Sequence, residues 1–123
     1  MKNIGKNGEI LAANYLIAMG YEILDVNYFN HKGYRIGEID IIAKDPKGNI
    51  VFAEVKTRKG DEKAWVPGEN VNPDKLQKIE KAANVFLRDN DFIGKTWRID
   101  LIGVLFNTKT RKASIRHIKA IRV

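Results

Sequence analysis

Two stretches of sequence decide the expected fold: GEIDII at residues 37–42 and FAEVKTR at residues 52–58. Both are rich in Ile, Val and Phe, which is typical of β-strands, yet each carries acidic residues where a core strand is usually apolar. The turn-forming sequence DPKGN, residues 45–49, lies between them. Pro46 presets φ at the second position of a turn, and Gly48 can adopt a positive φ at a bulge. The pattern therefore predicts a β-hairpin with a three-residue loop.

The register of this hairpin brings two carboxylates together. If Asp45 pairs with Asn49, then Asp40 lies opposite Glu54, to within the one residue that a bulge can add. Opposite residues have Cβ atoms about 5 Å apart, and two carboxylates at that separation repel each other by about 3 kcal/mol at an effective dielectric of about 20. A positive group is therefore expected between them. A divalent cation explains the pair better than Lys56 alone.

Length and composition bound the class of protein. With 123 residues the chain is expected to form one domain, residues 1–123, that buries about two-thirds of its unfolded surface. No apolar run approaches the roughly 20 residues of a membrane span, and the N-terminus lacks a signal-peptide core. Cysteine is absent, which excludes disulfides, thiolate catalysis and cysteine-ligated zinc. We expect a cytoplasmic protein that does not associate with membranes.

The charge of the chain favours a polyanionic partner such as nucleic acid. The formal net charge is +7, and the last part of the sequence carries basic residues without acidic ones. No acidic residue follows Asp100, whereas six basic residues do: Lys109, Arg111, Lys112, Arg116, Lys119 and Arg122. The alternative is a solvated basic segment that serves only solubility.

The rest of the chain predicts two helices and three further strands around the hairpin. Apolar residues at three- and four-residue spacing predict a helix over residues 4–19, and a strand follows at 21–29. An Asn-Pro-Asp sequence at residues 72–74 is typical of a helix start, and that helix is expected to end near Arg88. A nearly continuous apolar run at 96–106 predicts a central strand, with a short last strand near the C-terminus at 113–118.

The resulting order is α-β-β-β-α-β followed by the short strand. An antiparallel meander comes first, and the second helix then crosses over to a strand parallel to the third. We therefore expect the α/β class (more narrowly α+β), with a mixed sheet of about five strands and helices packed on it.

Several single residues are weaker candidates for a functional site. Glu9 lies at the margin of the apolar stripe of the first helix, from which it can reach the edge of the sheet. Gln77, near the start of the second helix, can reach a phosphate or a metal-bound water, although most such residues are solvated. Neither His31 nor His117 receives a functional role.

Residues 58–72 show no clear period and are expected to form a loop next to the site. Its basic residues and one aromatic, Arg58, Lys59, Lys63 and Trp65, suit contact with nucleic acid by charge and stacking. The alternative is that Trp65 packs on the core. Lys75 and Lys78 extend the basic surface along the second helix.

Three segments carry a resemblance to a known site. Glu9, then GEID at residues 37–40, then EVK at residues 54–56, resemble the Glu…Asp…Glu-x-Lys site of restriction-endonuclease-like nucleases, which archaeal Holliday-junction resolvases share. Over most of its length the chain resembles more closely the YraN-type family, small bacterial proteins of that superfamily. The resemblance implies a restriction-endonuclease-like core.

The resemblance also implies metal-dependent hydrolysis of phosphodiesters. Asp40 and Glu54 would then bind Mg²⁺ or Mn²⁺ together with the carbonyl of Val55, and Glu9 would bind a second ion directly or through water. Lys56 would orient or help to deprotonate the attacking water, or stabilise charge on the phosphate. The expected catalytic set is thus Lys56, Asp40, Glu54 and Glu9.

Glu38 shares the face of Asp40 by the alternation of side chains along a strand. Glu38 is therefore expected to lie next to the metal ligands and to hold them in place without binding the ion itself. The same role is expected of Gln77 on the second helix.

Three functional hypotheses follow. The first is a structure-selective DNA endonuclease of repair or recombination, acting on junctions, flaps or ends, with DNA favoured over RNA and a homodimer possible by analogy. The second is a nucleic-acid-binding module that does not cleave. The third is a protein-binding domain whose carboxylates are neutralised by Lys56, Arg58 and Arg98.

Overall fold

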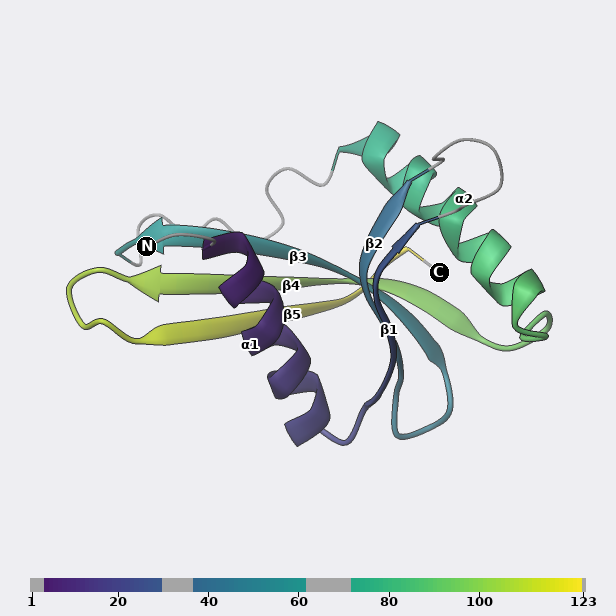
Figure 1. Ribbon diagram of the computed structural model, residues 1–123, viewed down its shortest axis with the longest axis horizontal. Coiled ribbons are helices and arrows are strands. Elements are labelled where there is room, and N and C mark those ends of the chain that lie inside the picture. Colours follow the sequence, from purple (N-terminus) through teal and green to yellow (C-terminus); the bar gives the residue numbers. More distant parts are fainter. Residues whose placement is uncertain (1–3, 30–36, 62–71, 123) are drawn as a thin grey trace.

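The computed structural model describes residues 4–29, 37–61 and 72–122 of the chain (Figure 1). In chain order the elements are α1 (Ile4–Ala18), β1 (Glu22–Phe29), β2 (Glu38–Lys44), β3 (Ile50–Gly60), α2 (Pro73–Asp89), β4 (Trp97–Asn107) and β5 (Ala113–Arg122). The predicted α+β class and the predicted order of elements are confirmed.

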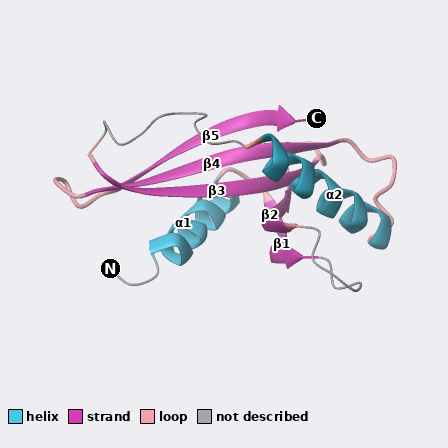
Figure 2. Cartoon of the chain, turned by 90° about the horizontal axis from the view of Figure 1, so that it is seen from above, coloured by secondary structure: helices cyan, strands magenta, loops and turns pink. Residues whose placement is uncertain are grey.

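The five strands form one sheet in the order β1-β2-β3-β4-β5. Neighbouring strands are antiparallel except β3 and β4, which are parallel and are joined by the crossover through α2. The sheet twists strongly, so that β1 and β2 turn away from the common direction of β3, β4 and β5 (Figures 1 and 2). The predicted meander followed by a parallel crossover is confirmed.

The hairpin between β2 and β3 has the predicted register. The amide of Asp45 donates to the carbonyl of Asn49 at 2.9 Å, and Lys44 pairs with Ile50. Gly48 adopts a φ of +89° and donates to the carbonyl of Asp45, which closes the three-residue loop. The ladder ends at the pair of Ile41 and Ala53, one residue before Asp40 and Glu54.

Each helix covers one face of the sheet with its own apolar cluster. Ala12 and Leu16 of α1 pack on one face, in a cluster with Ile41 and Val51. Ile79, Ala82, Ala83, Phe86 and Leu87 of α2 pack on the opposite face, in a cluster with Ile42, Ile50 and Phe52. Asn72 caps α2 as predicted, because its side chain accepts a hydrogen bond from the amide of Asp74. The two helices therefore reach the end of the β2–β3 ladder from opposite faces.

Two predicted boundaries are wrong. β3 continues to Gly60, because its parallel pairing with β4 extends to Asn107, so Arg58 and Lys59 lie on a strand and not in a loop. β5 runs to Arg122 instead of ending at residue 118. It passes through a bulge at Ala120, whose φ is +58°, and then pairs again with Ile99. Within the described part of the chain, no helix has the length and apolar character needed to span a membrane.

Candidate functional site

A cleft of about 700 Å³ opens where the β2–β3 ladder ends. The first helix, the start of β2, the middle of β3 and the start of α2 all contribute to its walls. Its lining residues are Glu9, Gly37, Glu38, Asp40, Glu54, Asn72, Asp74, Lys75, Lys78 and Ile79. All four carboxylates that the sequence singled out, on residues 9, 38, 40 and 54, therefore meet in one cleft.

Asp40 is held in the cleft by the backbone of β3. Its Oδ2 accepts a hydrogen bond of 2.8 Å from the amide of Val55. Because the N–H and C=O of one strand residue point to the same neighbouring strand, the carbonyl of Val55 also faces the side of Asp40. It lies beyond the last pair of the β2–β3 ladder, between Ile41 and Ala53. Two carboxylates and one carbonyl thus gather at this point.

The environment of Asp40 disfavours its charged form. Burial, and then the neighbouring carboxylate of Glu54, raise the pKa of Asp40 to about 7, although the amide of Val55 opposes that shift. Glu54 is itself 8% exposed. Two buried acids side by side are unfavourable unless a proton or a cation joins them.

Lys75 of α2 supplies the positive charge beside Glu54. Its Nζ lies 2.5 Å from Oε1 of Glu54, across the gap between α2 and β3. Partial burial lowers the pKa of Lys75, but the contact with Glu54 outweighs that effect, so the pKa is raised overall. The sequence suggested Lys75 only as a contact to nucleic acid, and the structure adds this ion pair.

Glu9 reaches the same cleft from α1. Burial, followed by the charges of Asp40 and Glu38, raises its pKa. Gly8 permits this approach, because a Cβ at that position would lie 2.1 Å from Oγ1 of Thr57 on β3. The helix therefore lies so close to the strand that only glycine fits.

Gly37 has the equivalent role for α2. A Cβ at Gly37 would lie 2.7 Å from the carbonyl oxygen of Lys78. The start of β2 thus contacts the backbone of the helix that carries Lys75. Two glycines, one for each helix, set the width of the cleft.

The potential metal ligands in the cleft are all oxygen atoms, which is the type of ligand that hard divalent cations prefer. Asp40, Glu54 and the carbonyl of Val55 are the groups that would hold such an ion. Within residues 4–29, 37–61 and 72–122, no three Asp, Glu or His side chains lie close enough together to hold one ion. Here the cation next to Glu54 is the ammonium group of Lys75.

Lys56 lies on the same side of β3 as Glu54. It borders a smaller hollow beside the cleft, together with Glu54, Lys75 and Leu101. It does not line the cleft of Asp40 itself. Lys56 is therefore adjacent to the acidic pair and not between its two members.

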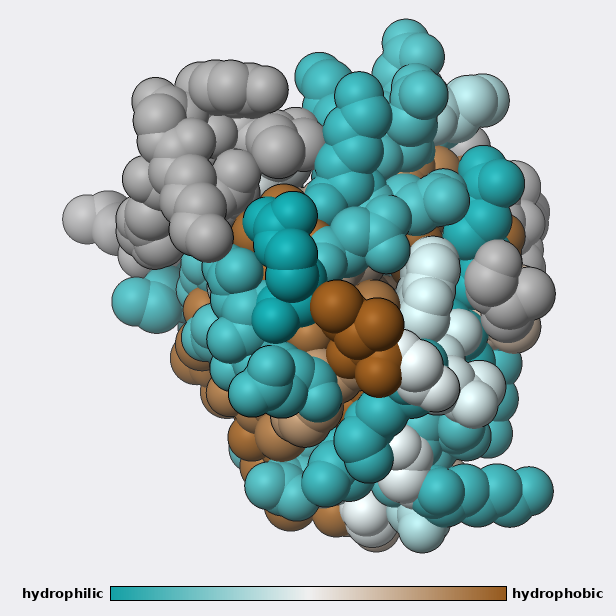
Figure 3. Space-filling model, turned by 90° about the vertical axis from the view of Figure 1, so that its right-hand side faces the viewer, coloured by the Kyte–Doolittle hydropathy of each residue, from teal (hydrophilic) through white to brown (hydrophobic). Residues whose placement is uncertain are grey.

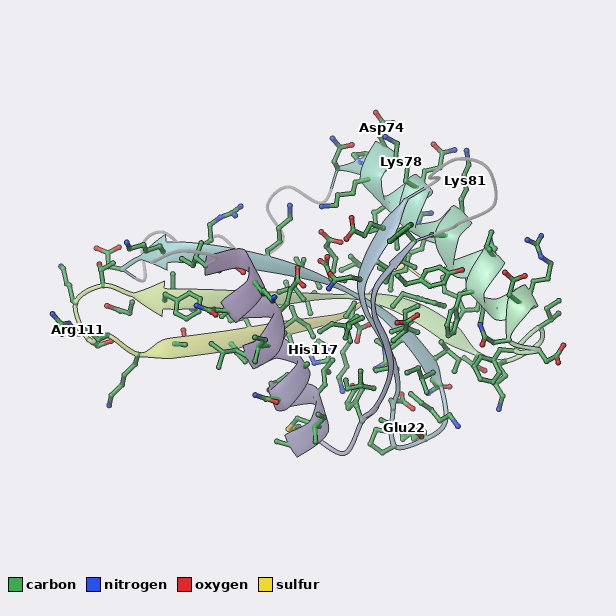
Figure 4. The ribbon with its side chains drawn as sticks, in the orientation of Figure 1. Glu22, Asp74, Lys78, Lys81, Arg111 and His117 are labelled. Carbon is green, nitrogen blue, oxygen red and sulfur yellow. The ribbon has the colours of Figure 1, made fainter. Side chains whose placement is uncertain are left out.

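The other predicted contacts divide into two groups. Lys75 and Lys78 line the cleft, whereas Arg58 and Lys59 lie further along β3. Gln77 borders a separate hollow next to Glu80 on α2 and does not line the cleft, so its contact with a phosphate or a metal-bound water stays a prediction. The outward side of α2 also carries Lys81 (Figure 4), and the face of the molecule at this end is largely hydrophilic (Figure 3). Lys63, Trp65 and His31 lie outside the described residues.

A second polar centre, which the sequence did not reveal, lies under α1. Asp100 of β4 is fully buried, and its carboxylate accepts hydrogen bonds from Nε of Arg98 and the amide of Ala120, both at 2.9 Å. Nε2 of His117 lies 2.7 Å from the same carboxylate, and Nδ1 of His117 lies 3.0 Å from the hydroxyl of Tyr15. Figure 4 shows His117 beside α1.

Arg98 extends this centre to the β2–β3 hairpin. It donates to Oδ2 of Asp45 at 2.7 Å and to the hydroxyl of Tyr21 at 3.0 Å. The hydrogen bonds that Asp45 accepts from Asn49, Arg98 and Lys47 outweigh burial and lower its pKa to about 2. Arg98 therefore pairs with Asp45 and Asp100, and not with the carboxylates of the cleft as the third hypothesis expected. A charged residue within an otherwise apolar strand was the signal that could have identified this centre, because a buried charge requires partners.

Comparison with known proteins identifies the family. The chain is 44% identical over 119 residues to the UPF0102 protein of Clostridium tetani (strain Massachusetts / E88), which covers 96% of this chain and 92% of that protein. It is 42% identical over 120 residues to the UPF0102 protein of Caldicellulosiruptor bescii (strain ATCC BAA-1888 / DSM 6725 / KCTC 15123 / Z-1320), covering 97% and 96%. The model of the uncharacterised protein family UPF0102 matches residues 8–104, which include the cleft acids and both spacing glycines. The chain belongs to the uncharacterised protein family UPF0102.

Proposed function

We propose that the protein binds nucleic acid, DNA in preference to RNA, at this cleft and hydrolyses a phosphodiester bond with Mg²⁺ or Mn²⁺. The observation that carries the proposal is the acidic pair of Asp40 and Glu54. Burial and mutual repulsion raise the pKa of Asp40 to about 7, an arrangement that a divalent cation would relieve. A fold gains no stability from such a pair by itself.

The residues around the pair suit this reaction. When bound, the ion would lower the pKa of water and polarise a phosphoryl oxygen. Asp40, Glu54 and the carbonyl of Val55 would hold it, with Glu9 facing them from α1. Lys56 would orient the attacking water or offset the charge that grows on the phosphate. Lys75 and Lys78, with a net charge of +7 on the whole chain, favour approach of a polyanion.

The resemblance to restriction-endonuclease-like nucleases supports the same reading, and it suggests a structure-selective enzyme of DNA repair or recombination. Junctions, flaps and ends are the substrates to test first. A homodimer and a cytoplasmic location belong to the same proposal. The molar mass of the protein in solution, measured by light scattering, tests the dimer.

A second candidate is a nucleic-acid-binding module that does not cleave. The ion pair between Lys75 and Glu54 favours it, because an ammonium group already neutralises one of the two acids. The lack of three clustered ligand side chains within the described ranges also favours it. Binding would then depend on salt and persist in Asp40→Ala.

The decisive experiment compares cleavage of duplex, single-stranded, flap and four-way-junction DNA with Mg²⁺ and with Mn²⁺. The proteins are the wild type, Asp40→Ala, Glu54→Ala and Asp25→Ala. Asp25 is a matched control, because its carboxylate accepts a hydrogen bond from the next amide along β1, that of Val26, and does not line the cleft. Thermal unfolding confirms that each variant is folded, and fluorescence anisotropy in EDTA measures binding separately.

Cleavage by the wild type and Asp25→Ala, lost in both cleft variants, would establish the nuclease. Binding of equal strength in all four proteins without cleavage would leave the binding module. Absence of binding in every protein would contradict both candidates. Divalent ions should also raise the unfolding temperature of the wild type more than that of Glu54→Ala, because only the intact site binds them.

A further inference from the structure

The ends of β3 and β4 and the start of β5 extend beyond both helices, and the far end of this extension is basic (Figure 1). β4 stays paired with β3 up to Asn107, and the chain then turns back into β5. The turn carries three cations, Lys109, Arg111 and Lys112, and is called the basic turn below. Figure 4 shows Arg111 at the end of the extension, far from Lys78 at the start of α2.

Hydrogen bonds hold the backbone of the basic turn in one shape. Oδ1 of Asn107 accepts from the amides of Lys109 and Thr110, at 2.9 Å and 3.1 Å. The carbonyl of Asn107 accepts from the amide of Arg111 at 2.8 Å. The turn also donates a backbone hydrogen bond of 3.1 Å to Gly60, the last residue of β3. The basic turn is therefore fixed at the end of the sheet.

The cations of the basic turn are exposed to solvent and have few acidic neighbours. Lys109 lies 3.9 Å from Asp61, and its side chain is still 79% exposed. Within the described ranges, no ion pair involves Arg111 or Lys112. Arg111 moreover has a φ of +60°, a conformation that glycine and asparagine adopt at lower cost. Because neighbouring cations repel each other, contact with a polyanion would stabilise this turn.

The distance from the cleft to the basic turn is set by β3. Six residues along this strand separate Glu54 of the cleft from Gly60 next to the turn. A strand rises by about 3.3 Å per residue, so the two places are roughly 20 Å apart. Each strand of a nucleic-acid duplex rises by about 3.4 Å per nucleotide, so this distance corresponds to about six base pairs.

We infer that the basic turn binds the phosphate backbone of a nucleic-acid duplex, about six base pairs from the phosphate at the cleft. This inference rests on the proposed binding of nucleic acid at the cleft. A duplex has a persistence length of about 150 base pairs, so it keeps its phosphates at a fixed spacing and can contact both places at once. A flexible single strand would lose conformational freedom when held between them, which favours the duplex.

The test measures the anisotropy of labelled GC-rich DNA duplexes of 6, 9, 12 and 16 base pairs at 5 °C, and of a 16-nucleotide single strand, in EDTA and at increasing NaCl. Wild-type affinity should rise steeply between 6 and 12 base pairs, because only the longer duplexes reach both places. The double variant Arg111→Ala with Lys112→Ala should lose this steep rise. It should also bind the longest duplex about tenfold more weakly at 100 mM salt, with a salt slope lower by about 2, as expected for two lost phosphate contacts.

The matched control is the double variant Lys47→Ala with Lys95→Ala. It removes the same charge from two turns at the opposite end of the sheet, next to the first β3–β4 pair of Ile50 and Trp97. This control should bind every duplex like the wild type. The exchange of Arg111→Lys with Lys112→Arg should retain the rise and the slope, because it keeps both charges. Unfolding temperatures equal to the wild type confirm that the variants are folded.

The outcomes separate this inference from the proposed function. If the wild type binds but the variant of the basic turn keeps the steep rise, or the control loses as much affinity, the inference is wrong while the cleft proposal stands. Equal losses on the single strand and the duplex would also overturn it. If the expected pattern appears but no substrate is cleaved, the duplex contact stands and the nuclease activity fails. If the wild type does not bind, both are overturned.

Discussion

Asp40 has an energetically unfavourable position for a carboxylate. Val55 donates one hydrogen bond to it, but burial and Glu54 together outweigh that bond and raise its pKa to about 7. An aspartate in an unfolded chain has a pKa of about 3.9. Ionised Asp40 therefore destabilises the folded state, which is the expected property of a residue kept for binding and not for stability.

Replacement of Asp40 by Asn should stabilise the protein in a pH-dependent way. The protonated form of Asp40 is favoured in the folded state, so its contribution is fully present below pH 4 and is lost as the pH rises to about 7. Asn still accepts from Val55 and never ionises. Thermal unfolding of Asp40→Asn and wild type should coincide near pH 4 and differ by about 2–4 kcal/mol at pH 8.

The control for this change is Asp25→Asn, at an acid on β1 outside the cleft. Its stability relative to wild type should not follow the same pH profile. A difference between Asp40→Asn and wild type that is constant from pH 4 to pH 8 would show that Asp40 is not destabilised by its surroundings.

At the scale of the elements, two glycines position the helices against the sheet. Gly8 places α1 on Thr57 of β3, and Gly37 places β2 on the backbone of α2 at Lys78. A side chain at Gly8 or Gly37 would force a neighbouring helix or strand to shift, and each of these elements carries a residue of the cleft. The cleft therefore depends on backbone approach as well as on its carboxylates.

Gly37→Ala should lower stability by about 1–3 kcal/mol and reduce nucleic-acid binding, because the added methyl group meets a helix backbone that cannot rotate away. Gly5→Ala is the control, since nothing lies within 4 Å of its Cβ position and alanine favours a helix. Chemical denaturation measures the first effect, and anisotropy measures the second. Equal stability of the two variants would show that α2 can move without penalty.

Gly8→Ala allows a sharper test through its contact with one side chain. The nearest atom is Oγ1 of Thr57, at 2.1 Å from the Cβ position, and it is absent in Thr57→Ala. The double variant should recover part of the stability that Gly8→Ala loses, which a double-mutant cycle measures as an interaction energy above about 0.5 kcal/mol. Additive losses would indicate that the close approach is not at Thr57.

At the scale of the whole molecule, the centre around Asp100 adds polar contacts between the β2–β3 hairpin, α1 and β5, which also meet in the hydrophobic cluster under α1. Through Arg98 it holds the β2–β3 hairpin at Asp45, and through His117 it contacts Tyr15 of α1. Its bond from the amide of Ala120 fixes the bulge that allows β5 to pair again near its end. Arg98, His117 and the amide of Ala120 all contact this one buried carboxylate.

Asp100→Asn should therefore lower stability strongly, by about 3–5 kcal/mol, because it leaves Arg98 without one of its charged partners. In addition, the NH2 group of the asparagine would face the hydrogen-bond donors that now contact the carboxylate. Glu22→Gln, at an exposed acid that begins β1 (Figure 4), should change stability by less than about 0.5 kcal/mol. Thermal and urea unfolding measure both. A loss of less than about 1 kcal/mol for Asp100→Asn would show that the centre contributes little to folding.

The sequence by itself determined the elements, the hairpin and its register, because apolar period and turn chemistry are local properties. Pro46 and Gly48 define the loop, and the alternation in β2 and β3 then brings Asp40 to Glu54. The start of α2 at Pro73 followed from its capping residues in the same way. These parts of the cleft required no knowledge of distant contacts.

Only the tertiary structure decided which side chains of α2 enter the cleft and what neutralises its acids. Lys75 faces Glu54, whereas Gln77, two residues later, is rotated by about 200° around the helix and faces away. The sequence predicts that helix but not its rotation about its own axis, which packing of its apolar face on the sheet sets.

The sequence also does not reveal the partners of Asp100, because they come from distant segments that meet only in the folded chain. Tyr15 and His117 are 102 positions apart, and they meet only because α1 packs across β5. Likewise Ile39 packs in the α2 cluster and Ile41 in the α1 cluster, although strict alternation places them on one face. The change occurs at Asp40, where the β2–β3 ladder ends, so the twist and end of the sheet decide the shape of the site.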